Sequence, residues 1–250
     1  MRRISIALIL VLFSNSADAA IALSTSNTTL NQFPGTATIV ASITTGVGSD
    51  FCLVATVGIE DTTTATDVTV TSVPALTWTK VGTIVVTNDT DERVTAWIAV
   101  GAAASTLYAV TATADTATAD YFPGLGVFAF TDVDQVTPQD TTFQTTSSTD
   151  AGMSSISTSI TTATAGAMLV DVAALGGSGA GDLTPDTGQT DIAGTASEFG
   201  TSYELVAGAG AYTQGYTFTS PSADDRVVHL VLALREAGGV ASRRQAMVLN

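Results

Sequence analysis

The sequence predicts an all-β protein folded as an antiparallel β-sandwich. Apolar and β-branched runs recur along the chain, with Gly, Asp, Asn and Pro between them. Many runs alternate Thr with Val, Ile or an aromatic residue, which is typical of strands with one buried face. No stretch combines helical periodicity with capping residues. The nearest, residues 99–105, is short and contains a glycine, which indicates a turn.

The expected strands follow one another through most of the chain. Their ranges are 36–43, 51–59, 67–73, 76–86, 93–100, 106–113, 124–133, 154–160, 167–175, 201–210, 212–220 and 226–236. The Ser/Thr-rich stretch 141–164 interrupts the series, and we expect a solvated crossover with an edge strand there.

The order of these runs repeats once. FCLVATVGI leads through LTWTKV, RVTAWIAVGA and YAVTATAD to GLGVFAFTDV. AMLVDVAALGG leads through DIAGTA, TSYELVAGAG and YTFTSPSAD to RVVHLVLALRE. No linker divides the halves. We therefore expect two sheets, or two Greek-key halves, of one sandwich domain.

Several packing and turn motifs carry a family resemblance. They are Leu76-Thr77-Trp78, residues 93–102, residues 108–113 and residues 124–140. In this order they resemble the jelly-roll-like β-sandwich domain of secreted surface and appendage proteins and of viral structural proteins. The resemblance covers most of the chain after residue 30. It implies a jelly-roll-like fold and brings no catalytic signature.

Residues 1–19 have the three parts of a secretory signal peptide. Arg2 and Arg3 precede an apolar run over residues 4–13, and Ala17-Asp18-Ala19 fits the cleavage rule. The run is shorter than the ~20 residues that cross a bilayer. The alternative is a buried N-terminal strand. With the leader removed, we expect a secreted β-sandwich domain over 20–236 without a membrane span, and a basic flexible tail over 237–250.

The composition excludes some partners. Hydrophobic residues make up 45% of the chain, charged residues only 12%, and the net charge is -15. Between Ser5 and Asp225 the basic residues are Lys80 and Arg93. Such a body repels phosphate backbones and anionic membranes, so we expect no nucleic-acid partner. The basic tail is expected either to be solvated or to dock on a neighbouring copy.

One cysteine and one histidine limit the chemistry. Cys52 lies in an apolar run and is expected in the core, an intermolecular disulfide being the alternative. His229 lies in mid-strand and is expected to be structural. GGSGA at 176–180 lacks the last glycine and the helix of a nucleophile elbow. GLGVFA at 124–129 opens a strand, so it does not predict a dinucleotide loop.

Acidic side chains are the remaining candidates for catalysis or metal binding. A glycosidase needs two acids ~5–10 Å apart. Glu198, Glu204, Asp132 and Asp134 lack the acidic–aromatic strand pattern of such a site, so we expect no enzyme. Asp132 and Asp134 are candidate calcium ligands, solvated turns being the alternative. No other cofactor is expected.

Glycans are considered both as modifications and as ligands. Asn27 and Asn88 begin N-glycosylation sequons, and the Ser/Thr-rich faces offer sites for O-glycans. A secreted glycan-binding module would need an exposed aromatic platform. Trp78 and Trp97 both lie in expected strands and are predicted to be core residues.

The surface indicates assembly. The exposed strands are Thr-rich and lack the lysines that protect sheet edges. We therefore expect a non-enzymatic structural subunit of an extracellular filament, surface layer or adhesive appendage. It would form a homo-oligomer or polymer through strand edges, and a virion structural protein is the alternative. The N-terminal segment is expected to add a strand to a neighbouring subunit through Ala20, Ile21, Leu23, Leu30 and Phe33.

Overall fold

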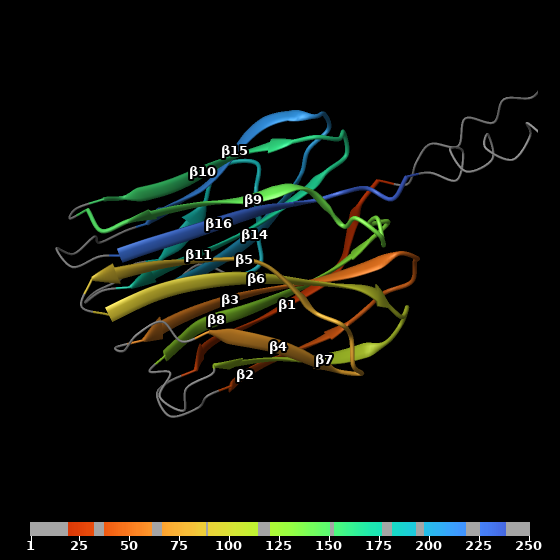
Figure 1. The fold of residues 1–250 in the computed structure, drawn as a ribbon, viewed down its shortest axis with the longest axis horizontal. Coiled ribbons are helices and arrows are strands. Elements are labelled where there is room, and N and C mark those ends of the chain that lie inside the picture. Colours follow the sequence, from red (N-terminus) through yellow and green to blue (C-terminus); the bar gives the residue numbers. More distant parts are fainter. Residues whose placement is uncertain are drawn as a thin grey trace, which may run out of the picture.

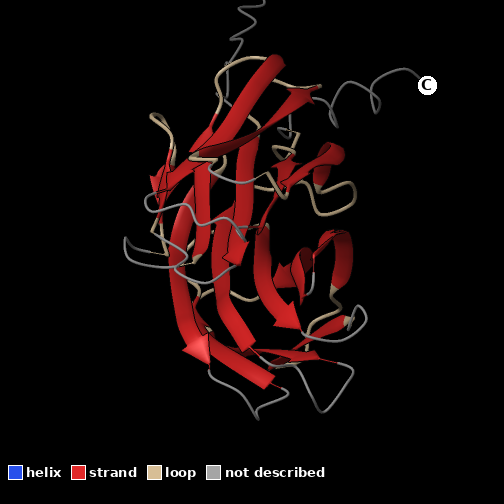
Figure 2. Cartoon of the chain, turned by 90° about the vertical axis from the view of Figure 1, so that its left-hand side faces the viewer, coloured by secondary structure: helices blue, strands red, loops and turns tan. Residues whose placement is uncertain are grey.

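The computed structural model shows a molecule built from β-strands (Figure 1). It describes residues 20–32, 38–61, 67–88, 90–114, 121–150, 153–176, 182–193, 198–218 and 226–238. The predicted leader 1–19, Phe33 and the tail from residue 239 lie outside these residues. Figure 2 shows strands and loops throughout the described chain. The described ranges hold no helix long and apolar enough to cross a membrane.

The first half forms two antiparallel sheets. The larger has the order β1-β8-β3-β6-β5 and the smaller the order β2-β7-β4. The strands are β1 (Ala22–Gln32), β2 (Thr38–Thr44), β3 (Phe51–Asp61), β4 (Val68–Val73), β5 (Thr79–Asn88), β6 (Thr90–Ala102), β7 (Leu107–Ala114) and β8 (Tyr121–Thr131).

The second half repeats this topology. Its larger sheet has the order β13-β14-β11-β16-β9 and its smaller sheet the order β10-β15-β12. Adding eight to each strand number of the first half reproduces both orders. The strands are β9 (Gln139–Ser148), β10 (Ser155–Thr162), β11 (Met168–Gly176), β12 (Leu183–Pro185), β13 (Thr190–Asp191), β14 (Phe199–Leu205), β15 (Gly210–Phe218) and β16 (Arg226–Leu234).

The four sheets stack as layers. The two larger sheets face each other in the middle, and the smaller sheets form the outer layers, β2-β7-β4 at the bottom of Figure 1 and β10-β15-β12 at the top. One apolar cluster joins the larger sheets across the halves, and further clusters fill the space under each outer sheet. The inner sheets are therefore covered on both faces.

This layering explains the two kinds of strand in the sequence. β11 and β16 are buried at every residue, as expected for strands covered on both faces. β2 and β10 alternate exposed and buried residues, as expected for an outer layer with one wet face. The all-β antiparallel sandwich and the two related halves are confirmed. Each half has one sheet of five strands and one sheet of three strands. The jelly-roll connectivity stays a prediction.

Three local predictions have clear outcomes. Residues 99–105 end β6 and turn into β7, as predicted. Of the two arrangements expected for the halves, the one in which each half is a single sheet is wrong, since each half has its own pair of sheets, and the Greek-key alternative stays a prediction. The stretch 141–164 contributes two strands, β9 at the edge of the larger sheet and β10 at the edge of the smaller one.

The GLGVFA stretch lies inside β8, where the glycines make room for the other half. A Cβ atom at Gly124 would lie 2.3 Å from the Phe199 ring, and one at Gly126 would lie 2.6 Å from a methyl carbon of Thr201. Both partners belong to β14. The glycines therefore permit close packing of the two larger sheets, which agrees with setting aside a dinucleotide loop.

Candidate functional site

A buried polar network lies inside the second half, and Asp171 of β11 is its centre. Asp171 is 1% exposed. Its Oδ1 accepts hydrogen bonds from Ser202 N (2.9 Å), Ser202 Oγ (2.7 Å) and Tyr216 OH (2.8 Å). Its Oδ2 accepts one from Gln189 Nε2 at 2.6 Å and lies 3.3 Å from His229 Nε2. The network joins β11 to β14, β15, β16 and the turn before β13.

The first half fills most of the equivalent space with apolar side chains. Between β3 and its outer sheet lie Leu53, Ala55 and Val57, all fully buried in one apolar cluster. In the second half the apolar residues of this layer form two separate clusters. Because the same strand order occurs in both halves, the topology itself does not require the network.

The network contains serine, histidine and aspartate, yet its geometry is not that of a hydrolase triad. Ser202 Oγ donates directly to Asp171, whereas a nucleophilic serine donates to the histidine. Ser202 and His229 are fully buried, so a substrate has no access. Burial raises the pKa of Tyr216, so its hydroxyl stays a donor. His229 is a buried residue of the interior, as predicted.

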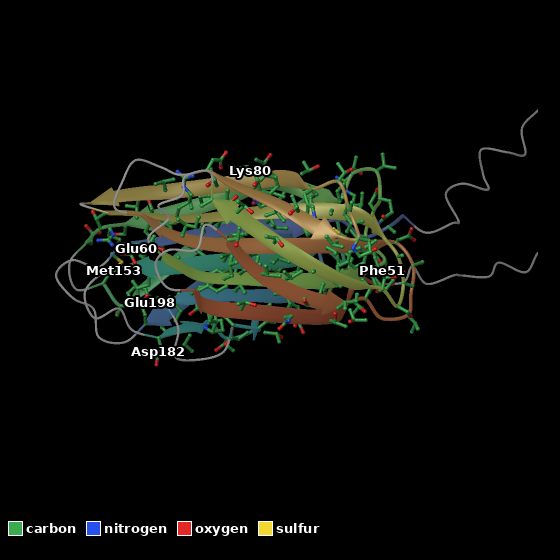
Figure 3. The ribbon with its side chains drawn as sticks, turned by 90° about the horizontal axis from the view of Figure 1, so that it is seen from below. Phe51, Glu60, Lys80, Met153, Asp182 and Glu198 are labelled. Atoms are coloured by element: carbon green, nitrogen blue, oxygen red, sulfur yellow. The ribbon has the colours of Figure 1, made fainter. Side chains whose placement is uncertain are left out.

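A second buried acid lies where the halves meet. Glu92 of β6 is fully buried, and neither carboxyl oxygen has a hydrogen-bond partner among the described residues. Arg226 donates to Glu60 Oε1 at 2.9 Å across the halves. Figure 3 shows Glu60 and Glu198 at one end of the molecule. Burial raises the pKa of Glu92 well above its usual value, the charges of Glu60 and Glu198 raise it further, and Arg226 opposes the shift.

The Glu92→Gln variant is expected to be more stable than the wild type at neutral pH. Above the ordinary glutamate pKa, the unfolded wild-type chain releases this proton while the folded chain keeps it. The wild type therefore loses stability as pH rises from that value towards the folded pKa, whereas glutamine has no proton to lose. Thermal unfolding at pH 4.5 and 7.5 should show that the Tm of Glu92→Gln exceeds that of the wild type by more at the higher pH. Each 1 kcal/mol of added stability raises Tm by about 2–4 °C.

The Asp150→Asn variant provides the control for removing one carboxylate, because Asp150 is exposed. Equal pH profiles for Glu92→Gln and the wild type would contradict the assignment.

The other acids predicted as candidates do not form a site. Asp134 Oδ1 accepts hydrogen bonds from Val136 N at 2.8 Å and Thr137 N at 3.0 Å, and these bonds lower the pKa of Asp134. No group of three or more His, Cys, Asp or Glu within the described residues is placed to hold a metal ion, so the calcium prediction at Asp132 and Asp134 gains no support.

Glu198 and Glu204 lie six residues apart on the extended chain that contains β14. This spacing puts them about 20 Å apart, beyond the reach of a glycosidase pair.

The N-terminal segment forms an edge strand of its own chain. β1 pairs with β8 over its length, Ile21 is buried in the core between the larger sheets, and Leu23 and Leu30 pack against that core. Ala20 is exposed. These contacts correct the interpretation of the segment as a free strand for a neighbour, since the chain itself satisfies its apolar side chains.

Side chains of β1 also close the adjoining edge of β2. Thr25 Oγ1, Asn27 Nδ2 and Thr29 Oγ1 donate to the carbonyl oxygens of residues 44, 42 and 40, at 2.9, 2.6 and 2.8 Å. Alternate residues of one strand thus meet alternate carbonyls of the other. Glycosylation of Asn27 would compete with this bond, because the glycan is attached to the same amide nitrogen. The Asn88 side chain lies outside the described residues.

Side chains also lie along the opposite edge of the small sheet. Trp78 Nε1 donates to Ser72 Oγ of β4 at 3.1 Å. Lys80 pairs with Asp67 and lies over the Trp97 ring, 5.7 Å from its centroid. Both tryptophans are partly buried and pack against the core of the first half, but Trp78 lies before β5 and not in the predicted strand. Trp78, Lys80 and their partners thus flank this edge, and Lys80 is a lysine of the kind that protects sheet edges.

A groove of about 850 Å³ lies at the junction of the halves. The loop before β5, Ile98 and Val100 of β6, and residues 135–139 line it. Gln135 is already engaged, since its Oε1 accepts from Gly101 N and its Nε2 donates to Val133 O, each at 2.8 Å. The lining residues are uncharged and none is aromatic, so the groove lacks the stacking platform of a glycan-binding module.

The outer face of the small sheet β2-β7-β4 is the most distinctive surface. Every second residue of its strands points outward, and none of these side chains is ionisable. They are Thr38, Val40, Ser42 and Thr44 of β2, Leu107, Ala109, Thr111 and Thr113 of β7, and Thr69, Thr71 and Val73 of β4. We call this surface the threonine face.

The strand register arranges the threonine face as a grid. Thr38, Thr113 and Thr69 form one row across the sheet, and Val40, Thr111 and Thr71 form the next. Val40, Val73 and Leu107 are 47%, 75% and 60% exposed. Figure 3 views the molecule from this side. Small, stiff and neutral side chains therefore form a regular exposed surface.

The outer face of β10-β15-β12 is also rich in hydroxyls but differs in one respect. Ser159 Oγ and Thr213 Oγ1 lie 3.1 Å apart across two of its strands. A Cβ atom at Gly215 would lie 2.6 Å from Asp186 Oδ2, so a carboxylate covers the centre of this sheet. The two outer faces are therefore chemically distinct.

No protein-family model, curated protein or solved structure matches the chain. Cys52 is a free thiol in the core, and burial raises its pKa to about 12. Its location agrees with the predicted core role and disfavours an intermolecular disulfide.

Proposed function

We propose that this protein is a non-enzymatic structural subunit that is exported and joins copies of itself in an extracellular assembly. The observation that carries the proposal is an uncharged threonine face on a chain with a net charge of -15. The surfaces of soluble proteins usually carry charges of both signs. A sheet face without charges does not repel a second copy, so it is suited to be a contact surface.

The positions of three acidic residues support a non-enzymatic role. Asp171 and Glu92 are buried, and Asp134 accepts hydrogen bonds within its own loop. The four-layer core gives a rigid block that suits a load-bearing role. The β2 edge is capped by side chains of β1, and side chains lie along the β4 edge, so the expected mode of association shifts from the edges of the small sheet to its face.

The proposal predicts that the chain from residue 20 self-associates reversibly. Sedimentation velocity over a wide concentration range, at low and high NaCl, should show species larger than the monomer that increase with concentration. High salt should favour them, because it screens the repulsion between acidic bodies. Electron microscopy of the concentrated sample would show the form of the assembly. A single monomeric species at the highest soluble concentration in high salt would overturn the proposal.

A further inference from the structure

We infer that the threonine face binds the same face of a second copy across a two-fold axis. This inference rests on the proposed function, and it names the contact surface that the assembly uses. The first argument is electrostatic. Two copies of a chain with a net charge of -15 repel each other, and the cost of approach is lowest where the facing surfaces carry no carboxylate. The threonine face meets this condition, whereas Asp186 lies over the opposite outer face.

The second argument concerns the chemistry of the grid. A hydroxyl both donates and accepts, so a surface of hydroxyls is complementary to a copy of itself. Threonine and valine also have restricted rotamers, so ordering them in a contact costs little entropy. Exposed Val40, Val73 and Leu107 add apolar area that a contact would remove from water.

The third argument concerns the contact area, which limits the affinity of the contact and the number of copies that it joins. Three strands of about seven residues cover roughly 14 by 23 Å, or about 300 Å². A standard interface buries about 800 Å² on each partner, so this contact belongs to the weak and concentration-dependent class. A contact between identical faces closes as a dimer and leaves the opposite face free. The dimer contact is then one of the interfaces of the larger assembly.

The test uses one substitution at two matched positions. Thr111→Lys places a charge at the centre of the threonine face, on the middle strand of its sheet. Thr213→Lys places the same charge on the middle strand of the opposite outer sheet, at an exposed position. Both reduce the net negative charge by the same amount, so a general loss of repulsion would strengthen association equally in both. Thermal unfolding checks that each variant folds.

Sedimentation equilibrium should show that Thr111→Lys weakens dimerisation at least tenfold, while Thr213→Lys leaves the dimer intact. Equal dimerisation of both variants and the wild type would overturn the threonine face as the contact and leave the proposed function standing. A wild type that stays monomeric would overturn the proposed function itself.

A second measurement remains decisive if Thr111→Lys fails to fold. Thr111→Cys adds an accessible thiol to a chain whose one native cysteine is buried. At a concentration where the wild type is partly dimeric, a short bis-maleimide should cross-link this variant into dimers and leave Thr213→Cys much less cross-linked. Equal cross-linking of the two variants would contradict the inference.

Discussion

Replacing Asp171 with alanine is expected to lower the free energy of unfolding by about 3–5 kcal/mol. The change removes the acceptor of hydrogen bonds from Ser202, Tyr216 and Gln189. The donors of Ser202 and Tyr216 are buried and lose this acceptor, whereas Gln189 keeps its bond to Ser202 Oγ. Each unsatisfied buried donor costs about 1–3 kcal/mol. Domains have only about 5–15 kcal/mol of stability in total, so the second half is expected to be the first part to unfold. Urea titration followed by circular dichroism measures the loss.

Two further variants separate the network from a general effect of losing a carboxylate. Asp150→Ala removes an exposed acid and should change stability by less than about 1 kcal/mol. Asp171→Asn keeps the shape and one acceptor oxygen, so it should lie between the wild type and Asp171→Ala. A stability for Asp171→Ala within about 1 kcal/mol of the wild type would show that the network relaxes.

The Phe199→Ala variant is expected to lower the free energy of unfolding by about 3–5 kcal/mol. It should also change the effect of Gly124→Ala from destabilising to stabilising. Phe199 is fully buried between the two larger sheets and packs on Gly124 of β8. In the wild type, Gly124→Ala places a methyl group 2.3 Å from the ring and should destabilise the protein. Without the ring, the same methyl group fills empty space and removes a flexible glycine, which favours folding by about 0.5–1 kcal/mol.

A double-mutant cycle measured by denaturant unfolding tests this coupling. The control cycle pairs Gly124→Ala with Phe218→Ala, because Phe218 is buried in a different apolar cluster. Its two effects should add within about 0.5 kcal/mol. If Gly124→Ala is equally destabilising with and without Phe199, the close packing of the two halves is not what the glycine serves.

The sequence predicts strands well where the pattern is local. Alternation in TIVASIT and SISTSIT marked the outer strands, because each has one wet face and one buried face. The continuous apolar runs of β3, β11 and β16 marked strands covered on both sides. The repeated order of runs also anticipated the two halves, since related segments keep similar burial. It did not show that each half carries two sheets.

The polar interior was not predictable in the same way. His229 was expected to be structural, but no local signal joined it to Asp171, which lies 58 residues earlier in the chain. Asp171 stands alone in an apolar run, and a lone acid there is the signal that invites a search for a buried partner. Glu92 lies next to Arg93 in the sequence, yet its burial follows from the contact between the halves.

The sequence by itself determined the all-β class, the positions of most strands and the repetition of two halves, because burial of alternate residues leaves a local period of two. Only the tertiary structure decided which strands pair, that the N-terminal segment closes its own sheet, and that the uncharged residues of β2, β4 and β7 meet on one face. Strand register joins residues far apart in the chain, and a local pattern does not encode which distant strand supplies the partner.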